Sequence, residues 1–282
     1  MKRRLLCLLI ILFLPFSCAF AKYNNDRITI VQDLPDPMNN VVDSQAFKPE
    51  ELSEASKAII DADNRTIQNP TEYPFTAIAY LDISYDCSHE GAYGTGFLIG
   101  KDWLITAGHC FYCPICRKPA DKFTLYFGYL KERNYLVRYE DSNWNAWIIS
   151  DAVRQGTNYY EYDYGVIHLS EPIGLKTGWF KLRYNVPDSE LEHGIFHVTG
   201  YRNGILKHDA DRVQPVDELY LRHFADTEMQ NSGCPVYDDS YGVVAINSAE
   251  KRDGSENYAV RITAEIYALL LENGYSPNPE TD

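Results

Sequence analysis

Residues 94–110 read GTGFLIGKDWLITAGHC. Two short apolar runs flank the polar residues 100–102, a pattern typical of two strands joined by a turn. His109 follows the second run, where the end of a strand can hold its ring in place. An imidazole titrates near neutrality and can therefore accept and return a proton. By itself the pattern favours a histidine that only caps a strand, so a catalytic interpretation needs partners elsewhere in the chain.

Two later stretches supply such partners. Asp163 lies just before an alternating apolar run in YDYGVIHL, residues 162–169. A buried aspartate in this position can orient an imidazole and stabilise its protonated form. Ser232 lies in NSGCPV, residues 231–236, and a glycine-containing turn of this kind exposes a hydroxyl and gathers backbone N–H groups. The order His, Asp, Ser is one of the known orders of a nucleophilic triad, so together the motifs predict nucleophilic catalysis.

With these motifs the chain resembles the chymotrypsin-like serine proteases, and within them the bacterial glutamyl endopeptidases. The resemblance covers most of the chain from about Ala58 onward. It rests on residues 60–65, 73–75, 94–110, 159–169, 178–180, 198–201, 226–237 and 257–263. It implies His109 as general base, Asp163 as its orienting carboxylate and Ser232 as nucleophile. It also implies that the backbone N–H groups of Gln230 and Ser232 form the oxyanion hole.

Many short strand-like segments separated by Gly, Pro, Asn and Asp predict an all-β protein, either a sandwich or a barrel. One helix is predicted from Ala264 to Glu272, with Thr263 as its N-cap. The resemblance implies two six-stranded antiparallel β-barrels followed by this helix. The length from Ala58 to the end suits one such barrel pair or one large all-β domain.

The first 21 residues have the three parts of a secretory signal peptide. Residues 2–4 are basic, residues 5–16 form an apolar run too short for a comfortable membrane span, and residues 19–21 read AFA. We expect cleavage after Ala21 and an exported protein, secreted to an extracellular or periplasmic space. Cys18 leaves a lipoprotein alternative open, in which that cysteine is acylated.

Residues 22–57 are polar, contain three prolines and show little apolar periodicity apart from residues 28–31. This composition predicts a weakly ordered extension and not a second domain. The resemblance implies a propeptide, with a linker of no function as the alternative. We therefore expect processing between Lys57 and Ala58 and a protease domain spanning residues 58–282.

The chain has 26 basic and 40 acidic residues and a formal net charge of −14. Residues 1–57 carry equal numbers of both, so the expected mature part keeps the whole charge. An acidic surface gives no support for binding to nucleic acid or to anionic membranes. We expect polypeptide substrates, no stable membrane association after signal removal, no cofactor and a monomer.

Five cysteines remain after the signal peptide: Cys87, Cys110, Cys113, Cys116 and Cys234. The first four have a spacing that could bind zinc through thiolates. Export to an oxidising compartment favours disulfides instead, so no metal is expected. We predict pairing of Cys87 with Cys110 and of Cys113 with Cys116, and a small buried thiol at Cys234.

The chain departs from the resembled family at several positions. Gly94 stands where relatives often carry the cysteine that pairs with Cys110. Gln230 replaces an oxyanion-hole glycine, and a side chain there can disfavour the required backbone orientation.

In the specificity pocket the resemblance assigns substrate contacts to Thr227, to the Ala58 amine and to Asn247, which replaces a histidine. We predict a serine endopeptidase that cleaves after acidic or polar residues (Glu, Asp, Gln). The alternative, motivated by Gln230, is a weak or silent binding module with the protease fold.

Overall fold

A computed structural model describes residues 28–31, 59–60, 62–85, 92–113, 118–130, 134–141, 147–150, 153, 161–250 and 254–277. The predicted signal peptide, Ala58, Cys87 and Cys116 lie outside these residues, as does most of the predicted propeptide. In the described part, no helix is long and apolar enough to cross a membrane.

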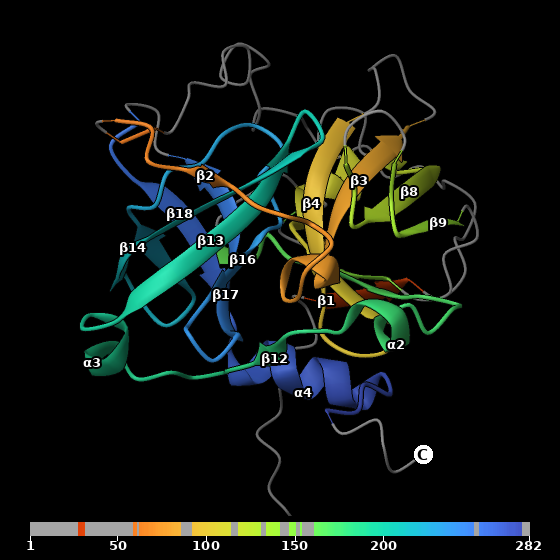
Figure 1. Ribbon diagram of the computed structural model, residues 1–282. Helices are drawn as coiled ribbons and strands as arrows, with labels where there is room; N and C mark the ends of the chain where they lie inside the picture. The colour runs from red at the N-terminus through yellow and green to blue at the C-terminus, as the bar shows by residue number, and fades with distance from the viewer. Residues whose placement is uncertain are drawn as a thin grey trace, which may run out of the picture.

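Two large antiparallel sheets stand side by side (Figure 1). The first has the order β1-β10-β11-β5-β4-β3-β8-β9. Its strands are β1 (Ile28–Val31), β3 (Ile78–Ser84), β4 (Ala92–Leu98), β5 (Trp103–Thr106), β8 (Lys122–Phe127), β9 (Val137–Asp141), β10 (Trp147–Ser150) and β11 (Gly165–His168). The stretch 94–110 therefore forms β4, a turn and β5 as expected, and β4 pairs with β5 from Gly96–Thr106 to Leu98–Leu104.

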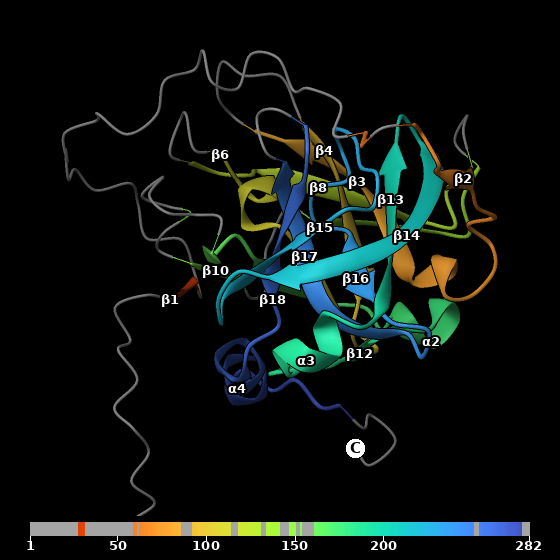
Figure 2. The same cartoon turned by 90° about the vertical axis from the view of Figure 1, so that its left-hand side faces the viewer.

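The second sheet closes into a six-stranded barrel (Figure 2). It runs β17-β16-β13-β14-β15-β18, and the pairing of β17 with β18 completes the circle. The strands are β13 (Ile195–Arg202), β14 (Ile205–Pro215), β15 (Tyr220–His223), β16 (Pro235–Tyr237), β17 (Gly242–Glu250) and β18 (Asn257–Arg261). The short strands β12 (Lys181–Leu182) and β2 (Thr66–Ile67) add to β17 and β14, and β6 (Tyr112–Cys113) pairs with β7 (Lys118–Pro119). The predicted all-β fold is confirmed in the described residues, which form one closed six-stranded barrel beside the eight-stranded first sheet.

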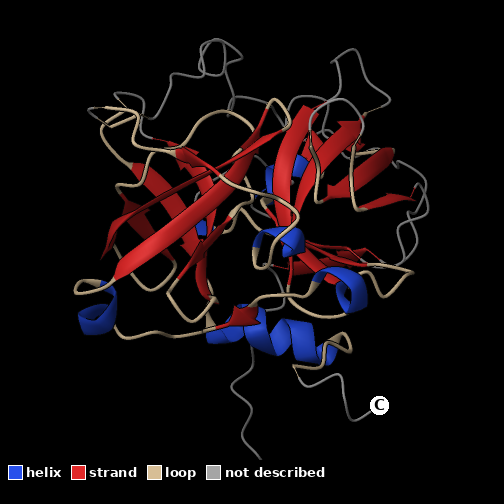
Figure 3. Ribbon diagram, viewed as in Figure 1, coloured by secondary structure: helices blue, strands red, loops and turns tan. Residues whose placement is uncertain are grey.

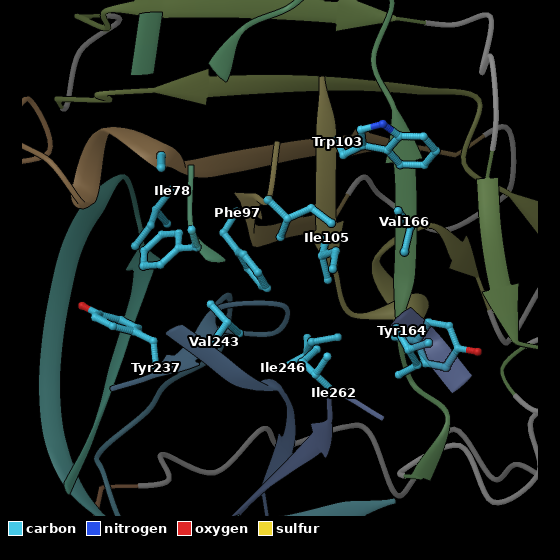
Figure 4. Packing of buried hydrophobic residues seen from close by; sticks show 14 of the residues in the cluster. Ile78, Phe97, Trp103, Ile105, Tyr164, Val166, Tyr237, Val243, Ile246 and Ile262 are labelled. Atoms are coloured by element: carbon cyan, nitrogen blue, oxygen red, sulfur yellow. The ribbon is translucent and has the colours of Figure 1, made fainter. Parts of the chain in front are cut away.

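Side chains of β3 and β4 contribute alternately to two different core clusters, because successive strand residues point to opposite faces. Ala79, Leu81 and Ile83 pack inside the first sheet. Ile78 and Phe97 belong to a second cluster that includes Val243, Ile246 and Ile262 of the C-terminal barrel. Figure 4 shows these side chains facing one another between the two sheets. Because both sheets contribute side chains to this second cluster, it fixes their relative position.

Helices occupy a small part of the described chain (Figure 3). Four of them are single helical turns: η3 (Phe75–Ala77), η4 (Gly108–Cys110), α2 (Gly174–Thr177) and α3 (Asp188–Leu191). The predicted C-terminal helix is present as α4 (Ala264–Glu272), and the Thr263 side chain accepts from Ile266 N as its N-cap. After α4 the Tyr275 hydroxyl donates to the Ile99 carbonyl at 3.1 Å, which joins the end of the chain to the first sheet.

Candidate active site

Two paired strands bring His109 and Asp163 together. β5 ends just before η4, which carries His109, and β11 begins just after Asp163. Because β5 and β11 are antiparallel and Gly165 faces Thr106, the two strand ends adjoin. Gly108 is required in this crossing, since a Cβ atom there would lie 2.8 Å from the Tyr164 carbonyl oxygen.

The Asp163 carboxylate is fully buried and accepts three hydrogen bonds. The His109 backbone N–H donates to Oδ1 at 2.8 Å, and the His109 ring Nδ1 lies 2.6 Å from Oδ2. Ser248 Oγ donates to the same Oδ2 at 2.5 Å. Burial alone would lower the pKa of His109, but the facing carboxylate raises this pKa well above 6.5. A ring held in this way has a fixed tautomer and a stabilised protonated form.

Ser232 is held in a tight turn against the first sheet. Its carbonyl accepts from Thr95 N at 2.9 Å and from Cys110 Sγ at 3.9 Å. The following Gly233 has φ +84°, and a Cβ atom there would lie 2.0 Å from Thr106 Oγ1, so only glycine fits.

Ser248 lies between two of the predicted catalytic residues, Asp163 and Ser232. Ser232 Oγ donates to the Ser248 carbonyl at 3.5 Å, while Ser248 Oγ binds Asp163. The structure therefore links Ser232 to Asp163 through Ser248 of β17, and Asp163 binds His109 directly. The sequence analysis missed Ser248; a polar residue inside the apolar run VVAINS is the signal that could have indicated it.

Gln230 adopts the left-handed backbone conformation with φ +77°. Its side chain accepts from Asn203 N at 2.7 Å, and its carbonyl accepts from Thr95 Oγ1 at 2.8 Å. These contacts offset the roughly 1 to 2 kcal/mol that a side chain costs in this conformation. Among the described residues, neither the Gln230 N–H nor the Ser232 N–H donates to a protein acceptor. Both N–H groups are thus available to bind an oxyanion.

The two predicted specificity residues in the described chain, Thr227 and Asn247, are both 4% exposed. The Asn247 amide is oriented from two sides. Its Nδ2 donates to the Asn231 carbonyl at 3.0 Å, and its Oδ1 lies 2.8 Å from His223 Nε2. Burial lowers the pKa of His223 to about 4, so this ring is neutral and its Nε2–H donates to Asn247. Sequence reasoning missed His223, which lies on β15 with no local motif.

The segment after the expected processing site is bound to the loop before Ser232. Ile60 N donates to Asp226 Oδ1 at 2.6 Å, and Asn64 N donates to Asp226 Oδ2 at 3.0 Å. Burial raises the pKa of Asp226, although these two donors oppose the rise. Asp226 directly precedes Thr227, so its carboxylate connects residues 60–64 to one of the predicted specificity residues.

An ion-pair cluster strengthens this connection. The Arg65 guanidinium, with 2% of its side chain exposed, lies 2.8 Å from Asp63 and 2.7 Å from Glu228. Lys207 lies 3.6 Å from the Glu228 carboxylate. The Glu228 N–H in turn donates to the Asn231 side chain at 2.7 Å, next to Ser232 in sequence.

The structure differs from the expected cysteine pairing. Cys110 carries a free, buried thiol, so the predicted disulfide with Cys87 is not formed by the described sulfur. The Cys113–Cys116 pairing involves a residue outside the described part. Cys234 is a free and buried thiol as predicted, and burial raises its pKa. The described residues hold no group of three His, Cys, Asp or Glu side chains suited to a metal ion.

Comparisons with known proteins show what the whole chain is similar to. The family model described as Trypsin matches residues 68–270. A glutamyl endopeptidase of Bacillus licheniformis is 29% identical over 237 residues, which span 76% of this chain and 68% of that protein. A protein named extracellular metalloprotease, from Bacillus subtilis, is 26% identical over 240 residues, 74% of this chain and 67% of that one.

Solved structures share the fold at lower identity. A Glu endopeptidase bound to MPD has a TM-score of 0.65 at 22% identity and covers 76% of this chain and 98% of its own. HL collagenase has a TM-score of 0.59 at 17% identity and covers 76% of this chain and 100% of its own.

Proposed function

Because this chain belongs to the trypsin family, we propose that it is a serine endopeptidase whose triad is His109, Asp163 and Ser232. One observation carries the proposal: the buried Asp163 carboxylate binds both the backbone N–H and the ring Nδ1 of His109. A carboxylate that holds the ring in this way leaves Nε2 free to accept the proton of the serine hydroxyl.

The proposed reaction proceeds through an acyl-enzyme. Ser232 Oγ attacks the substrate carbonyl carbon while His109 Nε2 takes the hydroxyl proton. The carbonyl oxygen becomes an oxyanion, which the N–H groups of Gln230 and Ser232 stabilise. His109 then gives its proton to the departing amine. Water, deprotonated by His109, attacks the ester and releases the acid with Ser232 restored.

For specificity we propose cleavage after acidic or polar residues: Glu, Asp and Gln. The name of the Bacillus licheniformis relative supports Glu. In this chain Asn247 offers a neutral amide, and one of its two N–H bonds is already used by Asn231. The remaining N–H can donate equally to a carboxylate or to an amide carbonyl. We therefore propose a weaker preference for Glu over Gln than a charged histidine would give.

We also propose export and processing: a signal peptide at residues 1–21, a propeptide at 22–57 and a mature start at Ala58. Two observations support this part of the proposal. A relative carries the name extracellular. In addition, the described residues just after Ala58 dock on Asp226, where a free N-terminal segment would complete the specificity site.

A fluorophosphonate probe tests the proposed nucleophile in the processed protein. We expect the probe to label Ser232, and the label to disappear in Ser232→Ala. Ser240→Ala, which changes an exposed turn serine, serves as the control and should keep the label. Absence of labelling in the folded native protein would support the alternative, a silent module in which Gln230 prevents a working oxyanion hole.

A further inference from the structure

Two histidines lie next to each other on the outer face of the C-terminal barrel, where β13 pairs with β14 (Figure 1). Val198 packs inside the barrel, so its neighbours His197 and Thr199 point outward. Thr199 pairs with His208 across the two strands, which places His208 on the same outer face. His197 Nδ1 lies 3.4 Å from His208 Nε2, and the two ring centroids are 5.1 Å apart. One nitrogen of each ring is therefore turned toward the other ring.

The second nitrogen of each ring is held by an oxygen atom. His197 Nε2 lies 2.8 Å from the Asp239 carboxylate, which only accepts, so this nitrogen carries a hydrogen. His208 Nδ1 lies 2.9 Å from Thr199 Oγ1, which in turn lies 2.9 Å from the Tyr237 hydroxyl. Because both hydroxyls can turn, Thr199 can accept from His208 and donate to Tyr237. In that arrangement both facing nitrogens present a lone pair to the space between the rings.

The distances across this space match those of two ligands on one metal ion. A tetrahedral ion with bonds of about 2.0 to 2.1 Å to imidazole nitrogens holds two such nitrogens about 3.4 Å apart and their ring centroids about 5 Å apart. The observed separations of 3.4 Å and 5.1 Å agree with both values. We propose that His197 Nδ1 and His208 Nε2 bind Zn²⁺ or a similar divalent transition-metal ion, with water completing the coordination.

The surroundings of the two rings suit such an ion. A histidine must be neutral to bind a metal, and burial together with the neighbouring His197 lowers the pKa of His208, although Asp209 opposes this shift. Histidine ligands commonly donate their other N–H to a carboxylate or another oxygen, which are the positions of Asp239 and Thr199 here. The His197 side chain is 24% exposed, so an ion can reach it from solvent. Imidazole favours zinc, copper or nickel, whereas calcium and magnesium favour oxygen ligands.

A bound ion would have a structural role. It would join β13 to β14 and, through Asp239, to the turn between β16 and β17. With two protein ligands, the site should bind more weakly than a closed structural zinc site with four. No sequence motif indicated it, because His197 and His208 are 11 residues apart and only the pairing of their strands brings them together.

Zinc binding by the full chain tests the proposal. The parent protein carries Ser232→Ala to prevent self-cleavage, and it is freed of metal with a chelator before equilibrium dialysis against Zn²⁺. Cysteines can also bind zinc, so the difference between variants is the measurement. The parent should bind one Zn²⁺ more than His197→Gln or His208→Gln. The control is His193→Gln, which changes an exposed histidine bonded to the Ser189 carbonyl and should bind as much zinc as the parent.

Asp239→Ala gives a second readout that does not disturb the fold, because the Asp239 side chain is 95% exposed. This variant should keep the additional Zn²⁺ but bind it about 10- to 100-fold more weakly, as is usual when the partner of a histidine ligand is removed. Zn²⁺ should also raise the Tm of the parent in a saturable way, since it binds the folded state. Ca²⁺ should leave the Tm unchanged.

Two results would overturn the proposal. Equal zinc content in the parent and in both histidine variants would show that His197 and His208 only hydrogen-bond to each other. Co²⁺ in place of Zn²⁺ should give no thiolate charge-transfer band from the additional ion; such a band, if it were lost in the histidine variants, would place that ion at the cysteines. None of these measurements uses catalysis, so they are independent of the proposed function.

Discussion

The guanidinium of Arg65 lies 2.7 Å from the carboxylate of Glu228 and is almost completely buried. This contact connects the segment after the expected processing site to the loop that carries Thr227, Gln230 and Ser232. The pair therefore holds residues 63–65 against the loop that carries the three residues.

Arg65→Ala should lower the free energy of unfolding by about 3 kcal/mol, because it leaves Glu228 without its buried partner. Urea denaturation in a Ser232→Ala background, which prevents self-cleavage, measures the change. Arg138→Ala removes the exposed ion pair with Glu140 and should change the stability by less than about 1 kcal/mol. Equal effects of the two substitutions would contradict the role given to Arg65.

Ser232→Ala and His109→Ala should each reduce peptide hydrolysis to near background. Base and nucleophile act as one unit, so the double variant should be no slower than either single variant. Single-turnover rates on a cleavable peptide measure this directly. Substantial turnover by Ser232→Ala would show that another residue is the nucleophile.

Activity should fall on the acid side with a midpoint above pH 6.5. His109 acts as a base only when neutral, and the Asp163 carboxylate raises the pKa of His109 above that value although burial opposes it. As the pH falls through this raised pKa, the ring becomes protonated and kcat/KM declines. Asp163→Asn should move the midpoint to lower pH and lower kcat by about 10⁴-fold. A native midpoint below pH 6 would be inconsistent with the observed geometry.

Gly94→Cys should form a disulfide with Cys110. A Cβ atom built at Gly94 lies 3.8 Å from Cys110 Cβ and 2.9 Å from its Sγ, within the usual range of about 3.5 to 4.5 Å between disulfide Cβ atoms. Closing this short loop should stabilise the fold by about 3 kcal/mol. Peptide mapping without reductant identifies the bond, and reductant should reverse the gain. A Cys110 already bonded to Cys87 in the native protein would prevent it.

Asn247→His should increase the preference for Glu over Gln by about tenfold. A hydrogen bond to a charged group is worth about 1.5 to 3 kcal/mol, against about 1 kcal/mol for a neutral one. A protonated ring at position 247 donates from both nitrogens, so it can donate to the substrate carboxylate and to the neutral His223 ring, which accepts at Nε2 in its other tautomer. The ratio of kcat/KM values for matched Glu and Gln peptides is the measurement. Hundredfold selectivity for Glu in the native protein would mean that Asn247 is not the determinant.

The sequence predicted those parts of the molecule that local patterns encode. Apolar runs and turn residues located β4 and β5, and an N-cap with one apolar face located α4. His109, Asp163 and Ser232 each lie in a short local motif, and contacts through Asp163 and Ser248 connect them in the structure. No local sequence pattern indicated the contacts between segments that are far apart in the sequence. Asp163 and Ser248 are 85 residues apart, and Ile60 and Asp226 are 166 apart.

Backbone conformation was also beyond sequence reasoning. Gln230 stands at a position that favours glycine, and nothing local shows that it adopts φ +77°. The conformation depends on Asn203, which comes from a hairpin tip on the neighbouring strands. The predicted Cys87–Cys110 disulfide was wrong for a similar reason: Cys110 is a free thiol, and spacing alone does not reveal which sulfur atoms meet.

The bond from the Tyr275 hydroxyl to the Ile99 carbonyl has a consequence for how the protein is made. Trp103 also packs edge-on against the Tyr275 ring, at a centroid distance of 6.2 Å. The turn between β4 and β5 is thus completed by Tyr275, a residue that follows α4. Because synthesis proceeds from the N-terminus, the β4–β5 turn cannot acquire these contacts until Tyr275 has left the ribosome, long after both strands have been made.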